Sequence, residues 1–477
     1  MSSNRKDKIT VIQSSVSLGD PHICSDSVGR LSIINNVYES LIKTDSTGKY
    51  LPSLAEEWTV KEDASTWFFK IRSGVKFHNG ETLKPSDVVA TLRRVLDPSI
   101  GGAFGTQGVY ISYLGNSEIT AVDDNAVKIV TEEPMADLLD LLVAMPISPE
   151  SELHKLPDEY CGSGPYKIVE QDRTRTILGA HDAYWGDSPR YKEIHWVAIR
   201  NQDDRVDALL GGKGDIITGV GLRGKERIEK EGNIKVHEQE SGLCIIYMCN
   251  AQKGPCTDRR VRQALNYGLD MDEIISVIKK GAATPLSGYL TPHHFGYNPE
   301  TPSYSYDPDK ARKLLAEAGY KDGLELVFDI PSVMPNEAPQ LTALMAEQYN
   351  KIGIQIKIVE HKDRAAYAEM VREKKINDAC CFDSSPRSTY RVLREKIQST
   401  LRGPWWQGYT NTDVDRLILK AQRTVSDNAR REVYQQIYSM IRDDAPWIFM
   451  YRPTNYWGVN SSLKDWTPRS DGLLLFF

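Results

Sequence analysis

The sequence predicts an α/β protein with more than one domain, and three observations lead to that prediction. The chain has 477 residues, more than a single hydrophobic core ordinarily supports, so two or three domains are expected. Apolar residues alternate with polar ones in some segments and recur with helical spacing in others. Alternating segments at residues 324–330 and 354–358 enclose a helical pattern. This order predicts a β-α-β unit with parallel strands and a right-handed crossover.

The first regular elements are expected between residues 67 and 130. Apolar and polar side chains alternate over residues 67–72, which predicts a strand with one buried face. Asn79-Gly80 supplies a turn. Pro85 then opens a helix with one apolar face, and a further strand is expected at residues 126–130.

Cap residues predict the helices of the second half. Thr257 is expected to cap a helix that begins at about residue 258. Asp270 and Glu273 form a capping box for the next helix. Asp307-Pro308 starts another, because aspartate caps a helix and proline suits its first turn.

Composition and charge exclude several classes of protein. The chain carries 59 Lys and Arg against 65 Asp and Glu, a formal charge of −6, with no large basic block. Nucleic acid is therefore not expected as the main partner. No stretch approaches the roughly 18 consecutive apolar residues of a membrane span. The polar N-terminus lacks the apolar core of a signal peptide. It fits a cytoplasmic protein, or a mature exported domain whose leader was replaced by a methionine.

Motifs for catalysis and metal binding are missing or incomplete. Seven cysteines form no CxxC pair, so they are expected to be small buried apolar residues rather than zinc ligands or a redox pair. Residues 219–225 match GxxxxGK, but Glu226 stands where a phosphate-binding loop needs Ser or Thr. A surface turn is the favoured interpretation there. His293-His294 is expected in a loop. No catalytic residue, cofactor or metal is predicted.

Short segments in a fixed order resemble family 5 solute-binding proteins, the peptide, nickel and opine receptors of bacterial ABC importers. In the first third of the chain these segments are VYESL at 37–41, LPSLAEEW at 51–58, WFFKIRSGVKFHNG at 67–80 and DVV at 87–89. Later ones are GSGPY at 162–166, AYWG at 183–186, DRRVRQALNY at 258–267 and DDAPWIFMY at 443–451. Each segment alone is a weak match to the family, but together the segments occur in the family's order over most of the chain.

The resemblance implies a periplasmic-binding-protein type II-like two-lobe fold with an extra subdomain in lobe 1. The expected division is 1–49 for the first part of lobe 1, 50–161 for the extra subdomain, 162–246 for the second part of lobe 1, 247–453 for lobe 2, and 454–477 for the C-terminal return to lobe 1. Hinges are expected at 244–250 and 451–456.

The function implied by the resemblance is that of a periplasmic, monomeric receptor. It would capture a solute between its lobes by hinge closure, leave it unaltered and deliver it to the transmembrane subunits of an ABC permease. A cytoplasmic peptide-directed hydrolase is the alternative from another class, although its catalytic motifs are missing.

Residues 382–391 occupy the position of the family's solute-contacting loop. Peptide-binding members carry a Trp-rich stretch and an aspartate there, whereas this chain has hydroxyls, two arginines and one acid. An arginine suits a carboxylate, and hydroxyls suit a polyol. The predicted solute is small, acidic and polyhydroxylated, an opine such as mannopinic or agropinic acid, with a short peptide as the alternative. The candidate contacts are Asp383, Ser384, Ser385, Arg387 and Arg391; for the two arginines, a solvated helix start is equally open.

A second group of candidates surrounds adjacent tryptophans. Trp405 and Trp406 cannot face the same way on a strand, so one is expected to contact solute while the other packs, or both to lie in the core. Tyr409 follows them in the family's Tyr-x-Asn segment. Weaker candidates are Tyr247, Asn250, His22, Asp26 and a cleft rim at residues 105–110.

Overall fold

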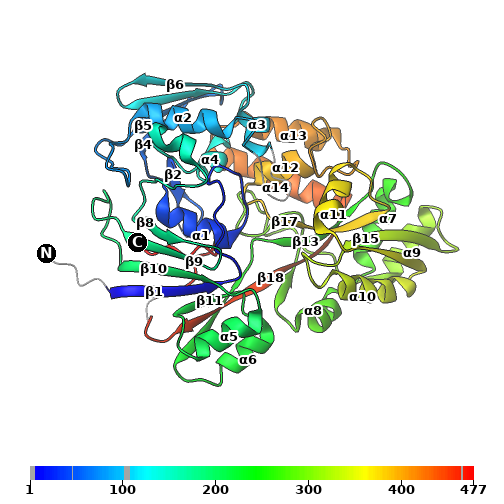
Figure 1. Cartoon of the computed structure of the whole chain (residues 1–477). Helices are drawn as coiled ribbons and strands as arrows, with labels where there is room; N and C mark the ends of the chain where they lie inside the picture. Colours follow the sequence, from blue (N-terminus) through cyan, green and yellow to red (C-terminus); the bar gives the residue numbers. More distant parts are fainter. Residues whose placement is uncertain (1–5, 46, 101–107, 464–465) are drawn as a thin grey trace. The chain divides into compact units, whose positions relative to one another are not determined.

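The computed structural model divides into two compact units, and it describes residues 6–45, 47–100, 108–463 and 466–477. Unit 1 consists of Met1–Gln239 and Asn455–Phe477, and unit 2 consists of Glu240–Thr454. The chain therefore crosses between the units twice. One crossing follows Gln239, and the other lies within the long strand β18 (Trp447–Asn460), coloured red in Figure 1.

Unit 1 contains a mixed sheet in the order β11-β1-β10-β9-β8, with the second half of β18 antiparallel to β11. Strand β1 is parallel to both of its neighbours, β10 and β11, whereas β10, β9 and β8 are antiparallel in turn. The strands are β1 (Lys6–Gln13), β8 (Tyr166–Gln171), β9 (Arg175–Ala180), β10 (Tyr191–Ala198), β11 (Ile216–Thr218) and β12 (Ile234–Glu240), which also pairs with β18. The helices here are α1 (Val28–Val37), α5 (Gln202–Leu210) and α6 (Leu222–Ile228), of which α5 and α6 lie side by side (Figure 1).

A second, four-stranded antiparallel sheet in unit 1 has the order β4-β5-β7-β6. Its strands are β4 (Ala55–Val60), β5 (Thr66–Ile71), β6 (Glu118–Asp123) and β7 (Ala126–Val130); β2 (Ile42–Thr44) and β3 (Tyr50–Pro52) form a separate pair. The neighbouring helices are α2 (Pro85–Val95), α3 (Val109–Leu114), α4 (Leu138–Leu142) and a 3-10 turn at Glu150–Lys155. The predicted strands at 67–72 and 126–130 and the helix beginning at Pro85 are confirmed within a residue.

Unit 2 contains a sheet in the order β16-β15-β17-β13-β18, with β14 against β18. Its other strands are β13 (Cys244–Cys249), β14 (Ala283–Pro285), β15 (Leu324–Pro331), β16 (Ile354–His361) and β17 (Ala379–Ser384). Its helices are α7 (Arg259–Tyr267), α8 (Met271–Lys279), α9 (Pro308–Glu317), α10 (Ala338–Asn350), α11 (Arg364–Arg372), α12 (Thr389–Lys396), α13 (Thr412–Gln422) and α14 (Asp427–Asp444), with a 3-10 turn at Pro255–Thr257.

The predicted β-α-β unit is β15-α10-β16. The two strands are parallel, and Leu324 pairs with Ile354. Leu326 and Phe328 are fully buried, as their alternation predicts. Ile358 is instead 37% exposed, because β16 is the outermost strand of its sheet and is covered less completely.

Helix caps agree with the sequence in part. The Asp270 side chain accepts a hydrogen bond from the Glu273 backbone N–H at 3.0 Å, which is one half of the predicted capping box, but the Asp270 N–H donates to Gln348 at 2.9 Å rather than to the Glu273 side chain. Asp307 caps α9 in the same way. The prediction for Thr257 is wrong, because Thr257 ends the preceding 3-10 turn. Asp258 caps α7 by accepting from the Arg260 N–H at 2.8 Å.

The C-terminal segment belongs to unit 1. Trp466, Leu474 and Phe476 join the hydrophobic core of unit 1. The units change over at Gln239/Glu240 and Thr454/Asn455, whereas the sequence places the lobe boundaries after residues 246 and 453. The five-part lobe division itself stays a prediction.

Close packing explains two glycines of the 162–166 segment. A Cβ on Gly162 would lie 2.2 Å from the Val37 carbonyl oxygen, and one on Gly164 would lie 2.7 Å from the same atom. Only glycine allows the two backbones to approach so closely.

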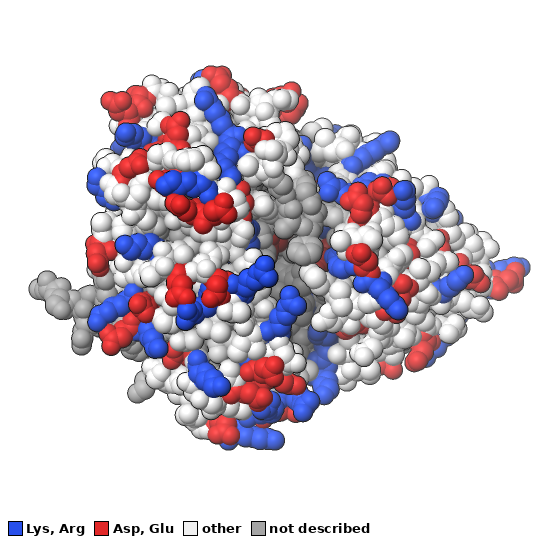
Figure 2. All heavy atoms as spheres, in the orientation of Figure 1, with Lys and Arg blue, Asp and Glu red and all other residues white. Residues whose placement is uncertain are grey.

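The seven cysteines are all buried, which confirms their expected role as small core residues. None of the helices within the described ranges combines the length and the apolar character that crossing a membrane would require. Figure 2 shows positive and negative side chains interspersed on the face in view.

Candidate functional site

The loop between β17 and α12 lies at the carboxyl end of parallel strands. Strand β17 is parallel to β15 and ends at Ser384. Helix α12 begins at Thr389, and Ser388 caps it by accepting from the Arg391 N–H at 3.2 Å. The carboxyl edge is where open α/β sheets bind ligands. We call residues 382–391, with the Arg364, Lys396 and Trp405 side chains that lie against them, the β17–α12 corner.

Two contacts from a neighbouring loop hold the corner in place. Nε2 of His294 donates to the Pro386 carbonyl at 2.8 Å, and the Thr389 hydroxyl donates to the Phe295 carbonyl at 2.5 Å. Burial lowers the pKa of His294 to about 4, so this side chain is neutral near pH 7. The corner is therefore preformed rather than a loose loop.

Ser384 presents a polar atom that the described structure does not satisfy. The residue is 2% exposed, and its Oγ has no hydrogen-bond partner among the described residues. An unpaired buried hydroxyl costs about 1–3 kcal/mol, and such groups call for a functional explanation. Asp383 and Ser385 beside it are half-buried, and Arg387 is exposed.

Two cations and an indole surround the Phe382 ring. The Arg364 guanidinium carbon lies 5.2 Å from the ring centroid and the Lys396 Nζ lies 5.4 Å from it. The Trp405 ring is 4.9 Å from the same ring, at an angle of 40°. Lys396 is 3% exposed, and its Nζ also donates to the Asp383 carbonyl at 3.3 Å. The cation–π contacts stabilise positive charge at the corner.

Arg391 has a carboxylate partner within its own helix. Its Nε donates to Oε1 of Glu395 at 3.0 Å, and both residues are buried. This ion pair ties Arg391 to α12, and its contact with a solute stays a prediction. Arg387 remains the candidate arginine for a carboxylate, because its side chain is exposed.

The antiparallel register of β13 separates other predicted residues from the corner. Cys244 pairs with Ser384 and Cys249 with Ala379. Asn250, which follows Cys249, therefore lies near the start of β17, whereas Ser384 and the corner lie at its end. Nδ2 of Asn250 donates to the carbonyls of Ile376 and Asn377 at 3.0 and 2.8 Å.

Three buried aromatic residues of the prediction also have internal partners. Tyr409 donates through its hydroxyl to Asp444 at 2.7 Å, and Trp406 donates from Nε1 to the Tyr409 carbonyl at 2.6 Å. The Tyr247 hydroxyl lies 2.5 Å from that of Thr342. Both indoles of the 405–406 pair are buried, and the Trp405 ring lies against Phe382 of the corner.

His22 and Asp26 lie in unit 1. His22 is 1% exposed, donates from Nε2 to the Pro146 carbonyl at 3.0 Å and accepts at Nδ1 from Arg94 at 2.9 Å. Arg94 in turn pairs with both carboxylate oxygens of Asp20. Burial lowers the pKa of His22 to about 4. Asp26 is half-buried just before α1. His22 thus fastens the segment before α1 to α2.

Two more predictions concern loops. Residues 105–107 of the proposed cleft rim lie outside the described residues, and Val109 and Tyr110 belong to α3 of unit 1. The GxxxxGK segment leads into α6, with Gly221 before its first turn. Lys225 donates to Glu238 at 3.1 Å, as expected of a surface turn and helix.

Sequence reasoning missed Arg364 and Lys396. Each is a charged residue on a helical segment, which ordinarily indicates a solvated face. Only the packing of α11 and α12 against the end of β17 reveals that both lie over Phe382.

Solved structures with the same fold identify the architecture. HbpA2 from Haemophilus parasuis superposes with a TM-score of 0.87 at 21% identity, covering 99% of both chains. AgaA in complex with agropinic acid, from A. tumefaciens R10, gives 0.79 at 23% identity, covering 98% of this chain and 96% of that one. The fold is thus that of the type II periplasmic binding proteins.

The sequence comparisons add the family. Residues 49–380 match the middle region of the bacterial extracellular solute-binding proteins, family 5, and the chain belongs to that family. The dipeptide-binding protein of Escherichia coli is 27% identical over 88% of this chain and 84% of its own length. Heme-binding protein A of Haemophilus influenzae is 26% identical over 89% and 83%. The chain is therefore a solute-binding receptor of the kind that serves ABC importers, and its relatives are named for what they bind.

Proposed function

We propose that this receptor captures a small, acidic, polyhydroxylated solute at the β17–α12 corner and releases it chemically unaltered. The observation that carries the proposal is the buried Ser384 hydroxyl, which has no partner within the described part of the chain, near the Phe382 ring that the cations Arg364 and Lys396 flank. A solute hydroxyl could satisfy Ser384, and a carboxylate would be attracted by the cations.

The charge balance of the corner supports an acidic solute. Arg364, Arg387, Arg391 and Lys396 bring four positive charges to the corner, whereas Asp383 is its one carboxylate and Arg391 pairs with Glu395 outside it. Arg387 also helps to lower the pKa of His293, after the larger effects of burial and of Arg452, so its charge reaches the loop that holds the corner in place. The similarity to AgaA, solved in complex with agropinic acid, fits an opine such as agropinic or mannopinic acid.

A short peptide is the second candidate, favoured by a specific residue. Asp383, the residue before the end of β17, is a half-buried carboxylate that could pair with a peptide's α-ammonium group. The dipeptide-binding relative from Escherichia coli supports this reading, and Arg387 could then hold the peptide carboxylate.

Four further features belong to the same proposal. We infer that the protein works in the periplasm as a monomer, and that it delivers solute to the transmembrane subunits of an ABC permease. The two crossings at Gln239/Glu240 and Thr454/Asn455 would act as hinges when solute binds.

A thermal-shift panel of agropinic acid, mannopinic acid and dipeptides would distinguish the solute classes. Binding to the native state raises the melting temperature in proportion to the logarithm of solute concentration over Kd. The proposal predicts a rise with the opines. A rise with dipeptides alone would reverse the order, and recovery of cleaved solute by mass spectrometry would contradict the receptor function.

A further inference from the structure

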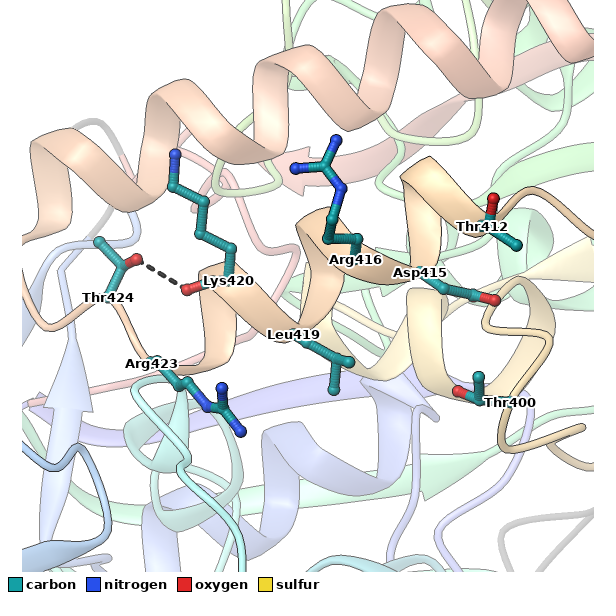
Figure 3. Close-up of a pocket in the computed structure, with 8 residues that line it drawn as sticks. All are labelled: Thr400, Thr412, Asp415, Arg416, Leu419, Lys420, Arg423 and Thr424. Atoms are coloured by element: carbon teal, nitrogen blue, oxygen red, sulfur yellow. Dashed lines mark hydrogen bonds between the residues drawn. The ribbon is translucent and has the colours of Figure 1, made fainter.

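Helix α13 of unit 2 carries a hollowed surface that the corner does not use. A cavity of about 620 Å³ lies along the helix and is lined mainly by Thr412, Arg416, Leu419, Lys420, Arg423 and Thr424 (Figure 3). All of its lining residues belong to unit 2. We call these six residues the α13 surface.

The spacing of the α13 surface gives the helix two different faces. Arg416, Leu419, Lys420 and Arg423 follow at i, i+3, i+4 and i+7, so they share one side. Val414, Leu417, Ile418 and Ala421 on the other side are buried, and α13 packs against α14. The core therefore does not account for Leu419, which is 40% exposed among three cations.

The α13 surface is positive although the chain as a whole carries a charge of −6. The carboxylate of Asp415, which also lines the cavity, is 6% exposed and accepts from the Ser399 N–H at 2.9 Å and from its hydroxyl at 2.5 Å. Asp413 pairs with Arg416 at 3.1 Å, but both side chains are about two-thirds exposed. Such exposed pairs are weak and can be exchanged for a better partner.

We propose that the α13 surface docks an acidic segment of a membrane permease, with an apolar side chain of the permease against Leu419. This inference rests on the proposed function, because a receptor must meet the permease that accepts its solute. Charge complementarity selects the acidic partner and speeds encounter, while the exposed leucine and the cavity supply shape. Leu401, beside the lining residue Thr400, is 45% exposed and would widen the apolar contact.

Site-specific photo-crosslinking in cells that naturally produce the protein tests the proposal. A photoreactive amino acid at position 419 is expected to give a product that mass spectrometry identifies as a permease subunit. The same probe at Val277, an exposed residue of α8, should give none. The triple variant Arg416→Glu, Lys420→Glu, Arg423→Glu should reduce the product by about tenfold or more, because reversed charges repel an acidic partner.

Matched controls separate docking from folding and from solute binding. Lys313→Glu makes a similar charge reversal at an exposed site of α9 and should leave the product unchanged. Lys420→Glu alone replaces the triple variant if the latter unfolds. Solute titration of the same preparations tests the proposed function separately from docking. The triple variant should bind solute with the same affinity as the wild type.

Three results would overturn the docking proposal. One is an undiminished product from the charge-reversed variant. Another is a product from position 419 that contains no permease subunit, or no product at all. The third is charge-dependent binding to phosphatidylglycerol vesicles without a permease product, which would assign the surface to anionic lipid.

Discussion

Nε of Arg391 donates a hydrogen bond to Oε1 of Glu395 at 3.0 Å, one turn further along α12, and the two side chains are only 8% and 7% exposed. Removing one partner of a buried ion pair leaves the other charge uncompensated, which costs more than the pair contributes. This relationship changes what the arginine is expected to do. The sequence leaves it equally open as a solute ligand or as a solvated helix-start residue, whereas in the structure it forms a buried ion pair within the helix that borders the β17–α12 corner.

Glu395→Gln is therefore expected to destabilise the protein by about 3 kcal/mol, because the Arg391 charge stays buried. Urea unfolding measures the change. Glu373→Gln is the matched control, because Glu373 pairs with Lys375 at a surface where the two side chains are 45% and 67% exposed. That substitution should change the free energy of unfolding by less than about 0.5 kcal/mol. Equal effects of the two substitutions would contradict the structural role of the α12 pair.

Ser384→Ala and Ser388→Ala should shift stability in opposite directions. Without solute, Ser384→Ala removes an unsatisfied buried hydroxyl and should raise the free energy of unfolding by about 1 kcal/mol. Ser388→Ala removes the cap of α12 and should lower it by about 1 kcal/mol. Only Ser384→Ala should weaken solute binding through a lost contact. Destabilisation by Ser384→Ala would show that its hydroxyl already has a partner.

Buried histidines should make the protein less stable in mild acid. Burial lowers the pKa of His22, His78 and His294 to about 4, from an ordinary value of 6.5. As the pH falls below 6.5, these three histidines therefore bind protons in the unfolded chain but not yet in the folded one. The stability from each histidine is complete above pH 6.5 and is lost as the pH falls toward 4. Each contributes a slope of up to about 1.4 kcal/mol per pH unit in that window.

Unfolding free energies measured between about pH 7 and about pH 5 test this slope. Burial raises the pKa of Glu39, and its effect on the pH dependence of stability has the opposite sign. The stability that Glu39 contributes is lost as the pH rises above 4.5, the ordinary pKa of a glutamate. The comparison of His22→Gln with the wild type isolates one histidine, and the variant should show the shallower slope. An unchanged slope would mean that His22 binds its proton equally well in the folded and the unfolded protein, so that burial does not lower its pKa.

Gly162→Ala should destabilise unit 1 strongly. Its Cβ would lie 2.2 Å from the Val37 carbonyl oxygen and 2.9 Å from the Val37 carbonyl carbon, and these backbone atoms have little freedom to move away. We expect a loss of about 3 kcal/mol or more, as for other overpacked sites. Gly232→Ala is the control, because a Cβ there would meet nothing within 4 Å. Similar melting temperatures of the two variants would contradict the close approach of the chains.

The sequence predicts the fold well because local signals decide it. Alternation, caps and the β-α-β order identify β5, α2, α8, α9 and β15-α10-β16 from a few residues each. The exceptions have physical causes that are not local. Ile358 lies on an edge strand, and Asp258 rather than Thr257 caps α7, because a 3-10 turn precedes the helix.

The candidate site is predicted less completely, because it depends on register and packing between distant segments. The sequence places a strand end and a following loop within residues 382–391, as the structure has them, but neither Lys396 nor Arg364 carries a local signal. The sequence places Asn250 and Ser384 among the same candidate residues. The antiparallel pairing of β13 with β17 instead puts Asn250 near the start of β17 and Ser384 at its end.

Calorimetric titration of agropinic acid into the wild type, Lys396→Met and Lys313→Met tests most directly where this receptor recognises a negative charge. Lys396 lies over Phe382, whereas Lys313 is exposed on α9, and each substitution removes one positive charge. We predict saturable one-to-one binding to the wild type and to Lys313→Met, with Lys396→Met weaker by about tenfold or more. Equal affinities for all three folded proteins, or no binding of any acidic solute, would contradict the recognition of a negative charge at the β17–α12 corner.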